Sequence, residues 1–375
     1  MNLNILHTPE GVRDLYGSEL LKKRQVLNAV RRTIDSFGYE PIETPTFEFF
    51  DVFSREVGTT PSRDLYKLFD KDGNTLVMRP DFTPPIARCA AKYFLEDKSP
   101  LRLSYEGSTF TNVKSLQGKL QEVTQMGAEL LQDDSVQADA EIIALVVNSL
   151  LACGLENFQV SVGHMEYFKG LCEEAGLQYE TEIALREAIS AKNIFAAEEL
   201  LSHFDLTEEI KEALLSVTDL FGSLTDISRA RELVHNKRSI MALDRLKELT
   251  DILKVYGVDR YVSFDLGLLS KYHYYTGIIF KAYAYGVGDA IVKGGRYDRL
   301  LHYFGKDAPA VGFAVVVDDV MEALDDQHTV SVGPNERLKV TYRDEEDYYD
   351  ALKKAMALRN EGKSVVLTRE VEDER

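Results

Sequence analysis

The segment from Gly294 to Asp319 constrains the fold of this chain more than any other. It reads GGRYDRLLHYFGKDAPAVGFAVVVDD, so that a glycine pair and a helix-like stretch precede an almost wholly apolar run. Such an uninterrupted apolar run is typical of a buried strand. We therefore predict a helix that follows a turn at the glycine pair, then an apolar strand and a second helix. Asp319 would lie where the strand passes into the second helix.

Further strands are predicted upstream of this segment. From Leu101 to Leu131, the runs SYEGSTF and EVTQMGAELL flank the polar loop NVKSLQGK, which is typical of antiparallel strands. LYKLFDKDGNTLVMR alternates apolar and polar residues about a DKDGN turn and predicts a hairpin. In YEPIETPTFEFF, Pro41 and Pro45 disfavour a helix and limit any strand to a sheet edge or an interface.

Helical periodicity marks other parts of the chain. A first amphipathic helix, followed by Gly38 as a left-handed cap, is indicated by Leu20, Leu27, Val30, Ile34 and Phe37. A helix is expected from near Thr83 and another over residues 134–153, before the short strand FQVSVGH. A mainly helical block follows from about Glu166 to Tyr256, and a strand, helix, strand pattern runs from Leu338 to Thr368.

These elements predict an α+β protein with a mostly antiparallel sheet flanked by helices. The expected division is a core in two parts, residues 1–165 and 257–330, with a helical insertion over residues 166–256 and a small C-terminal α/β segment over residues 331–375. We interpret the insertion as an arm that contacts another subunit, although a packed structural lobe is an equal alternative. The tail is either a reduced remnant of a larger domain or an unrelated appendage.

Composition narrows the class of protein. The chain has 375 residues, 45% hydrophobic and 28% charged, without a stretch of ~20 apolar residues that could span a bilayer. Its start lacks the charged and apolar regions of a signal peptide, so we expect a cytoplasmic location. The net charge of −18 argues against a nucleic-acid partner, because phosphate backbones are bound through lysine and arginine.

No cofactor or metal is expected from the motifs. EGKS at Glu361 resembles the end of a phosphate-binding loop, but it runs from helix into strand, so Gly362 is better explained as a helix C-cap. GVGDAI at Gly286 lacks the third glycine of a dinucleotide fingerprint. The seven histidines have no ligand spacing, and the three cysteines are interpreted as core thiols, namely Cys89, Cys153 and Cys172.

Several segments, taken in order, carry a resemblance to a known family. They are PEGVRD from Pro9, FGYEPIETPTFE from Phe37, VMRPDFTPPIARCAA around Arg79, the strand pair above, KYHYYTG around Tyr274 and the segment ending at Asp319. Together they resemble the catalytic core of histidyl-tRNA synthetase, up to about Ala323. The resemblance implies a class II aminoacyl-tRNA synthetase-like core, in which the segment from Phe37 forms the dimer contact.

The resemblance is incomplete at the ATP site. In the synthetase family, arginines would stand at the positions of Thr111, Ser270 and Asp319. Phosphoryl chemistry depends on cations placed against phosphate charge, and neutral hydroxyls cannot replace a guanidinium. We therefore expect no catalysis of its own, unless neighbours such as Arg79, Arg102 or Lys114 substitute. The tail is also too short for the family's tRNA anticodon-binding domain, so tRNA binding is not expected.

The amino-acid pocket of the family is largely retained. Carried over by position, Asp81, Thr83 and Gln125 would meet the amino group of histidine, with Asp81 replacing a usual glutamate. Glu129, Tyr274 and Tyr275 would face the imidazole, and Tyr297 would close the pocket. A purely structural alternative is that Gln125 and Glu129 lie on one sheet face with satisfied hydrogen bonds.

A synthetase-like core without ATP arginines resembles the regulatory subunits of ATP phosphoribosyltransferase. That resemblance implies assembly with a short-form catalytic subunit in histidine biosynthesis, as a dimer within a hetero-octamer, with histidine feedback as a further expectation. Two alternatives stay open. The chain could be a synthetase-like sensor of amino acids or tRNA, or an active ligase of the synthetase type.

Overall fold

The computed structural model describes residues 6–53, 60–113, 120–270, 274–328 and 337–370, without the side chains of residues 224–227. The predicted loop from Asn112 lies mostly outside these residues, as do Lys114 and His273. Contacts between residues divide the chain into two compact units. One comprises Met1–Leu15 and Lys23–Thr329, and the other comprises Tyr16–Lys22 and Val330–Arg375.

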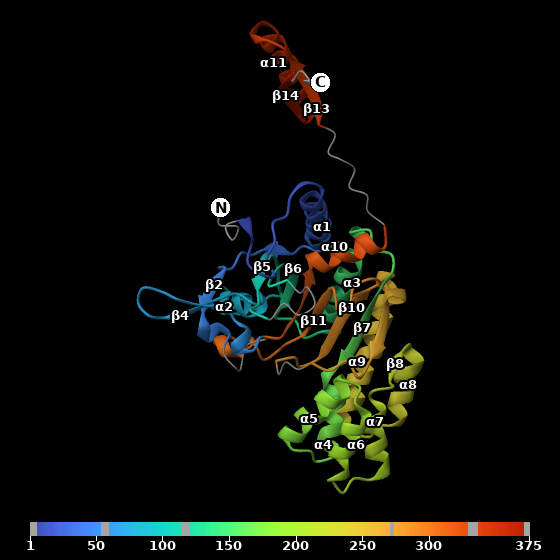
Figure 1. The fold of residues 1–375 in the computed structure, drawn as a ribbon. Coiled ribbons are helices and arrows are strands. Elements are labelled where there is room, and N and C mark those ends of the chain that lie inside the picture. The colour runs from blue at the N-terminus through green and yellow to red at the C-terminus, as the bar shows by residue number, and fades with distance from the viewer. Residues whose placement is uncertain (1–5, 54–59, 114–119, 271–273, 329–336, 371–375) are drawn as a thin grey trace. The chain divides into compact units, whose positions relative to one another are not determined.

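Across the described residues, nine strands form the main sheet of the first unit (Figure 1). In sheet order they are β1 (Glu40–Pro41), β5 (Leu101–Phe110), β6 (Glu122–Leu131), β12 (Ala310–Val316), β11 (Val292–Arg296), β10 (Ile278–Ala284), β7 (Phe158–His164), β9 (Val262–Asp265) and β8 (Phe221–Gly222). Neighbours are antiparallel except β1 with β5 and β7 with β9. The predicted mostly antiparallel sheet is confirmed, and Pro41 does lie on an edge strand.

A smaller sheet of three strands carries the predicted hairpin. Its order is β2 (Phe47–Phe49), β4 (Thr75–Met78) and β3 (Lys67–Phe69), all antiparallel. The Asp70 carboxylate closes the hairpin turn by accepting from the backbone N–H groups of Asp72 at 2.9 Å and Asn74 at 2.8 Å. Short 3₁₀ helices η2 (Phe50–Phe53) and η3 (Ser62–Asp64) join these strands, and α2 (Thr83–Tyr93) begins at the predicted threonine.

Helices cover the main sheet. The first helix, α1 (Gly17–Ser36), is followed by Gly38 at φ +79°, as predicted. α3 (Val136–Ala152) packs against β6, β11 and β12, and nearly all its apolar side chains are buried. α10 (Val317–Asp326) follows β12 and packs on β6 and β12. Within the described residues, no helix has the length and apolar character needed to cross a bilayer.

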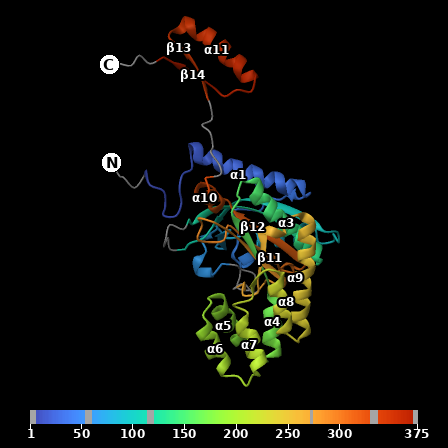
Figure 2. The ribbon, with the colours of Figure 1, turned by 90° about the vertical axis from the view of Figure 1, so that its right-hand side faces the viewer.

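Between β7 and β9 the chain is mainly helical (Figure 2). This helical block contains α4 (Met165–Glu174), α5 (Tyr179–Ser190), α6 (Ile194–Ser202), α7 (Glu208–Ser216), α8 (Leu224–Glu232) and α9 (Lys237–Tyr256), with β8 between α7 and α8 and η5 (Asp259–Tyr261) after α9. Side chains of Asn193, Thr207 and Asn236 accept from backbone N–H groups and cap three of these helices. α9 packs against both α4 and α3, which joins the block to the sheet layer.

The second unit contains β13 (Leu338–Tyr342), α11 (Glu345–Asn360) and β14 (Val365–Arg369). The two strands are parallel, and Val340, Ala351, Ala355 and Val365 form a small core between them and the helix. The predicted strand, helix, strand pattern is confirmed. Gly362 follows the helix at φ +79°, so the EGKS segment has helix C-cap geometry.

One expectation about the segment from Gly294 is wrong. The glycine pair does not turn a helix but lies inside β11, and the helix that follows is the short 3₁₀ helix η6 (Leu301–Phe304). The reason is close packing, because a Cβ at Gly294 would lie 2.5 Å from the carbonyl oxygen of Gly312 and 2.3 Å from the ring of Phe280. The apolar strand β12 and the helix α10 are confirmed.

Candidate functional site

A buried carboxyl group lies at the centre of the candidate site. Glu129 is on β6, between Leu103 of β5 and Gly312 of β12, and is 1% exposed. Thr83 Oγ1 donates to Glu129 Oε1 at 2.9 Å, and the Tyr297 hydroxyl donates to Oε2. A Cβ at position 312 would lie 1.6 Å from Oε2, so only glycine leaves room for this carboxyl. Both oxygens of Glu129 are therefore held by protein donors.

The Glu129 carboxyl has an unusual protonation equilibrium. Its pKa is raised to about 8, mainly by burial and to a smaller extent by the nearby charge of Asp81. The hydrogen bonds from Tyr297 and Thr83 act in the opposite direction and stabilise the ionised form. At neutral pH this carboxyl is consequently mostly protonated, and it can donate or accept a hydrogen bond.

Three tyrosines form one wall beside Glu129, which we call the tyrosine wall (Tyr274, Tyr275 and Tyr297). The Tyr274 and Tyr275 ring centroids are 4.5 Å apart, and the Tyr297 ring meets Tyr274 edge-on at 6.1 Å. Tyr274 and Tyr275 immediately precede β10, whereas Tyr297 follows β11. The wall packs into a cluster of buried apolar side chains that includes Phe82 and Leu301. Such a wall suits the face of a planar ring.

Asp81 and Thr83 belong to the start of α2. The backbone N–H of Thr83 donates to the Asp81 carboxylate at 3.1 Å, which fixes the first turn of the helix. Burial raises the pKa of Tyr105, and the charges of Glu129 and Asp81 raise it as well. The structure thus brings Asp81, Thr83, Glu129 and the tyrosine wall together.

Gln125 shares the sheet face of Glu129, four residues earlier on β6. The even spacing along one continuous strand is confirmed. The other half of the structural alternative, satisfied hydrogen bonds, holds for Glu129 but not for Gln125. Its Oε1 atom is buried and has no hydrogen-bond partner among the described residues. A buried acceptor without a donor is costly, and a bound ammonium group would satisfy it.

Sequence reasoning missed Tyr105 as a supporting residue of the site. Its ring stacks on Phe82 with centroids 4.5 Å apart, and its hydroxyl donates to the carbonyl oxygen of Phe313 at 3.1 Å. The register places it opposite Gly127, on the same face as Glu129. The alternation along β5 carries this information, but only once its pairing with β6 is known.

The arginines that could have replaced lost ATP contacts have other partners. Arg79 Nε donates to the carbonyl oxygen of Ser108 at 2.9 Å and Nη1 to that of Thr44 at 2.6 Å, with the guanidinium over the ring of Phe82. Arg102 forms a bidentate pair with Glu141, both contacts at 2.8 Å. These two cations hold the fold together.

The three positions at which the resemblance implies arginines lie on separate elements. Thr111 follows β5, and its backbone N–H donates to the carbonyl oxygen of Gln121 at 2.9 Å. Ser270 follows β9 and is buried. Asp319 lies in the first turn of α10, where burial raises its pKa to about 6 and the cation of Lys293 partly opposes that effect. Above that pH Asp319 carries a negative charge.

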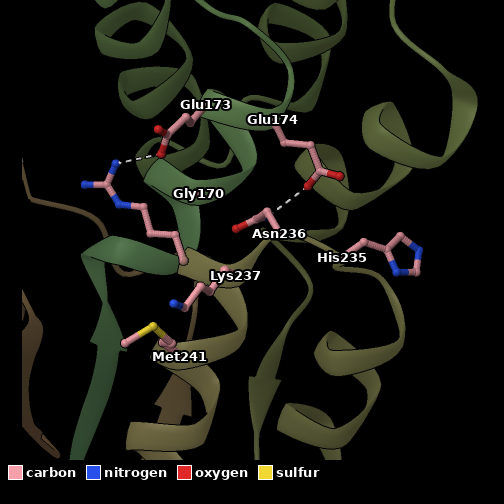
Figure 3. A pocket seen from close by; sticks show the side chains of 8 residues that line it. Gly170, Glu173, Glu174, His235, Asn236, Lys237 and Met241 are labelled. Atoms are coloured by element: carbon pink, nitrogen blue, oxygen red, sulfur yellow. Dashed lines mark hydrogen bonds and ion pairs between the residues drawn. The ribbon is translucent and has the colours of Figure 1, made fainter.

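Two surface hollows lie away from the candidate site. One of about 550 Å³ lies where α4 ends and α9 begins, and Figure 3 shows Glu174 pointing toward Asn236 there. Glu173 accepts from Arg238 Nη1 at 3.1 Å in the same hollow. Another of about 600 Å³ includes Tyr261, Tyr283 and Tyr285. Neither is lined by the predicted site residues. In the part of the chain that the structure describes, no group of histidine, cysteine and acidic side chains could hold a metal ion.

Comparison with known proteins places this chain in a family. The sequence model described as histidyl-tRNA synthetase matches residues 11–320. The ATP phosphoribosyltransferase regulatory subunit of Acetivibrio thermocellus is 42% identical over 340 residues, which cover 91% of this chain and 81% of that protein. The protein of the same name from Clostridium kluyveri is 39% identical over 358 residues, covering 95% and 91%.

Solved structures give the same result. A crystal structure from Bacillus halodurans C, described as an ATP phosphoribosyltransferase regulatory subunit/histidyl-tRNA synthetase, superposes with a TM-score of 0.90 at 33% identity. It covers 99% of this chain, which covers 95% of that one. Histidyl-tRNA synthetase from Nostoc sp. PCC 7120, at 19% identity and a TM-score of 0.80 over 98% of this chain and 86% of that one, shares the fold. The chain therefore belongs to the histidyl-tRNA synthetase family and, within it, to the ATP phosphoribosyltransferase regulatory subunits.

Proposed function

We propose that this chain enables a short-form ATP phosphoribosyltransferase catalytic subunit to carry out the first step of histidine biosynthesis, and that it catalyses no reaction itself. One observation carries the proposal. The buried carboxyl of Glu129 is held by Thr83 and Tyr297 beside the tyrosine wall, while an acid stands at position 319, where the resemblance implies an arginine. The names of the relatives support the same role. The cytoplasmic location predicted from the sequence is part of this proposal.

The absence of adenylation chemistry follows from charge. Thr111 and Ser270 are neutral, and Asp319 is ionised above a pH of about 6. At ~4 Å and an effective dielectric of about 20, one acid and one phosphate charge repel by on the order of 4 kcal/mol. Arg79 and Arg102 cannot compensate, since backbone carbonyls and Glu141 hold them.

The retained pocket is proposed to bind histidine. Asp81, Thr83 and Gln125 would take the ammonium group, and the unpartnered Oε1 of Gln125 supports this assignment. Glu129, Tyr274 and Tyr275 would hold the imidazole, with Tyr297 closing the pocket. Each missing charged hydrogen bond to the carboxylate of histidine removes about 1.5–3 kcal/mol, so binding should be weaker than in a synthetase. A site of that kind is suited to sensing histidine for feedback.

Self-association is proposed through one face of the three-stranded sheet. The register aligns Phe47 with Met78, and both Phe49 and Leu68 with Leu76. Phe47, Phe49 and Leu68 are 55%, 57% and 44% exposed in the single chain. A contiguous apolar patch of this kind marks an interface. The proposed assembly is a dimer through this face within a hetero-octamer with the catalytic subunit.

This interface has a direct test by light scattering. Phe49→Glu is expected to convert the dimer to a monomer, because a carboxylate would be buried without a partner. Phe195→Glu is a matched control, since Phe195 is 85% exposed on α6, in the helical block. A dimer that persists in the Phe49 variant would refute this face as the interface.

The remaining parts of the chain receive roles within the same proposal. Residues 1–165 and 257–330 form the synthetase-like core, and residues 166–256 form an arm that contacts another subunit of the complex. Residues 331–375 form a small α/β segment, which is either a remnant of a larger domain or an unrelated appendage. The whole chain has a net charge of −18, which disfavours tRNA.

The proposal is tested by assaying phosphoribosyl-ATP formation with the short-form catalytic subunit of the same organism. We expect activity to rise when this chain is added and to fall again as histidine is titrated. No change in activity with both proteins folded would refute the regulatory role. Histidine-dependent exchange of pyrophosphate into ATP by the chain alone would show an active ligase instead.

A further inference from the structure

A buried ionic network links the helical block to the candidate site. Asp139 on α3 is fully buried and is shared by two arginines. Its Oδ2 accepts from Arg245 Nε at 2.7 Å, and its Oδ1 accepts from Arg296 Nε at 2.8 Å. Arg245 belongs to α9, whereas Arg296 ends β11. One carboxylate thus joins the helical block to the main sheet.

The network continues from Arg296 to the tyrosine wall. Arg296 Nη1 contacts Asp298 Oδ1 at 3.1 Å, and Thr276 Oγ1 donates to Asp298 Oδ2 at 2.9 Å. The Thr276 N–H donates to the Arg296 carbonyl oxygen at 2.9 Å. Thr276 and Arg296 are the sequence neighbours of Tyr275 and Tyr297. The backbone on which both tyrosines are mounted is therefore part of the network.

At the other end, Arg245 attaches α9 to the start of α3. Besides Asp139, its guanidinium contacts the carbonyl oxygens of Asp134 and Ser135 at 2.8 and 3.0 Å. Ser135 also accepts from Arg296 at 3.3 Å. Both arginines therefore use the same carboxylate and the same carbonyl oxygen. Buried charges that share one partner respond together.

We propose that Arg245 and Asp139 are positioning residues for the tyrosine wall, and that through them the helical block regulates the pocket. A partner that moves α9 would change the affinity of the pocket for its ligand, and the ligand would in turn stabilise one position of α9. The identity of the ligand as histidine rests on the function proposed above. The mechanical link between α9 and the wall does not.

The first test measures amide hydrogen exchange without any ligand. Arg245→Met should speed amide exchange at Thr276, Tyr297 and Asp298 by about 5-fold or more. Five-fold is the lower end of the effects that are typical between two coupled sites. Arg238→Met is the matched control, since Arg238 is also on α9 but pairs with Glu166 and Glu173 of α4 within the block. The control should leave exchange at these amides unchanged.

Arg245→Lys is a second variant, included in case Arg245→Met fails to fold. Lysine keeps the charge but not the forked geometry of arginine, so an intermediate effect is expected. Unchanged exchange at the three amides in both Arg245 variants, or an equal change in the Arg238 control, would overturn the inference.

The second test measures histidine binding by calorimetry. Arg245→Met should weaken affinity by about 5-fold or more, and Arg238→Met by less than about 2-fold. Failure of the unmodified protein to bind histidine would refute the proposed ligand, while the exchange experiment would still decide the link. Histidine binding that is equally tight in the Arg245 variant would refute the regulatory part of the inference.

Discussion

Replacing Glu129 by glutamine is expected to remove a pH dependence from the stability of this protein. Burial raises the pKa of Glu129 from 4.5 to about 8. Between these values the folded chain keeps a proton that the unfolded chain releases. The free energy of unfolding therefore falls as pH rises through this window, and the stability present below pH 4.5 is lost by about pH 8.

The magnitude follows from the size of the window. At about 1.4 kcal/mol per pH unit, the loss for Glu129 is on the order of 5 kcal/mol across it. Glutamine has the same shape and cannot ionise, and its amide can exchange hydrogen bonds with the hydroxyls of Thr83 and Tyr297. The variant should match the unmodified protein near pH 5 and be the more stable of the two near pH 8.

Urea unfolding followed by circular dichroism, at several pH values from 5 to 8.5, measures this difference. Glu122→Gln is the matched control, because it is the same substitution at the half-buried start of the same strand. A difference in unfolding free energy between the Glu129 variant and the unmodified protein that does not change with pH would refute the reasoning. Such a result would mean that Glu129 is ionised in the folded protein.

Three further predictions concern the site and its support. Gly312→Ala should abolish histidine binding in calorimetry, because the added Cβ would lie 1.6 Å from Glu129 Oε2; unchanged binding would contradict the proposed pocket. Lys306→Met should lower the free energy of unfolding by about 1–3 kcal/mol in thermal unfolding, because Lys306 Nζ donates to three carbonyl oxygens at the end of α2. Lys363→Met is the control and should lower it far less, because Lys363 is half exposed. Asp319→Asn should stabilise the protein more at pH 7 than at pH 4. Burial raises the pKa of Asp319 to about 6, so at pH 7 the folded chain carries an unfavourable buried charge that asparagine removes. Equal effects of the substitution on the unfolding free energy at both pH values would refute this.

Much of the fold could be predicted because its signals are local. The alternation in LYKLFDKDGNTLVMR and the DKDGN turn gave the hairpin of β3 and β4, and the apolar periodicity of residues 134–153 gave α3. The glycine pair at Gly294 suggests a turn, but it lies within a strand. Glycine occurs both in turns and where two backbones pack closely, so its presence alone does not distinguish the two. Only the register of β11 against β10 and β12 distinguishes these uses.

The candidate site was predicted by resemblance, residue by residue, rather than from periodicity. The sequence placed Gln125 and Glu129 on one strand face. It did not predict that Thr83 and Tyr297 hold both oxygens of Glu129 while Oε1 of Gln125 has no partner. Hydrogen bonds between such distant residues depend on how strands and helices pack.

The sequence by itself determined much of the order of strands and helices, the synthetase-like framework and the absence of arginine at positions 111, 270 and 319. These properties depend on residue type and near neighbours. The tertiary structure decided the partners of the charged groups. Arg79 and Arg102 stabilise the fold, and Asp139 pairs with Arg245 and Arg296, which lie 106 and 157 positions away in the sequence. The physical reason is that burial and charge pairing depend on distances in space, which residue spacing along the chain does not specify.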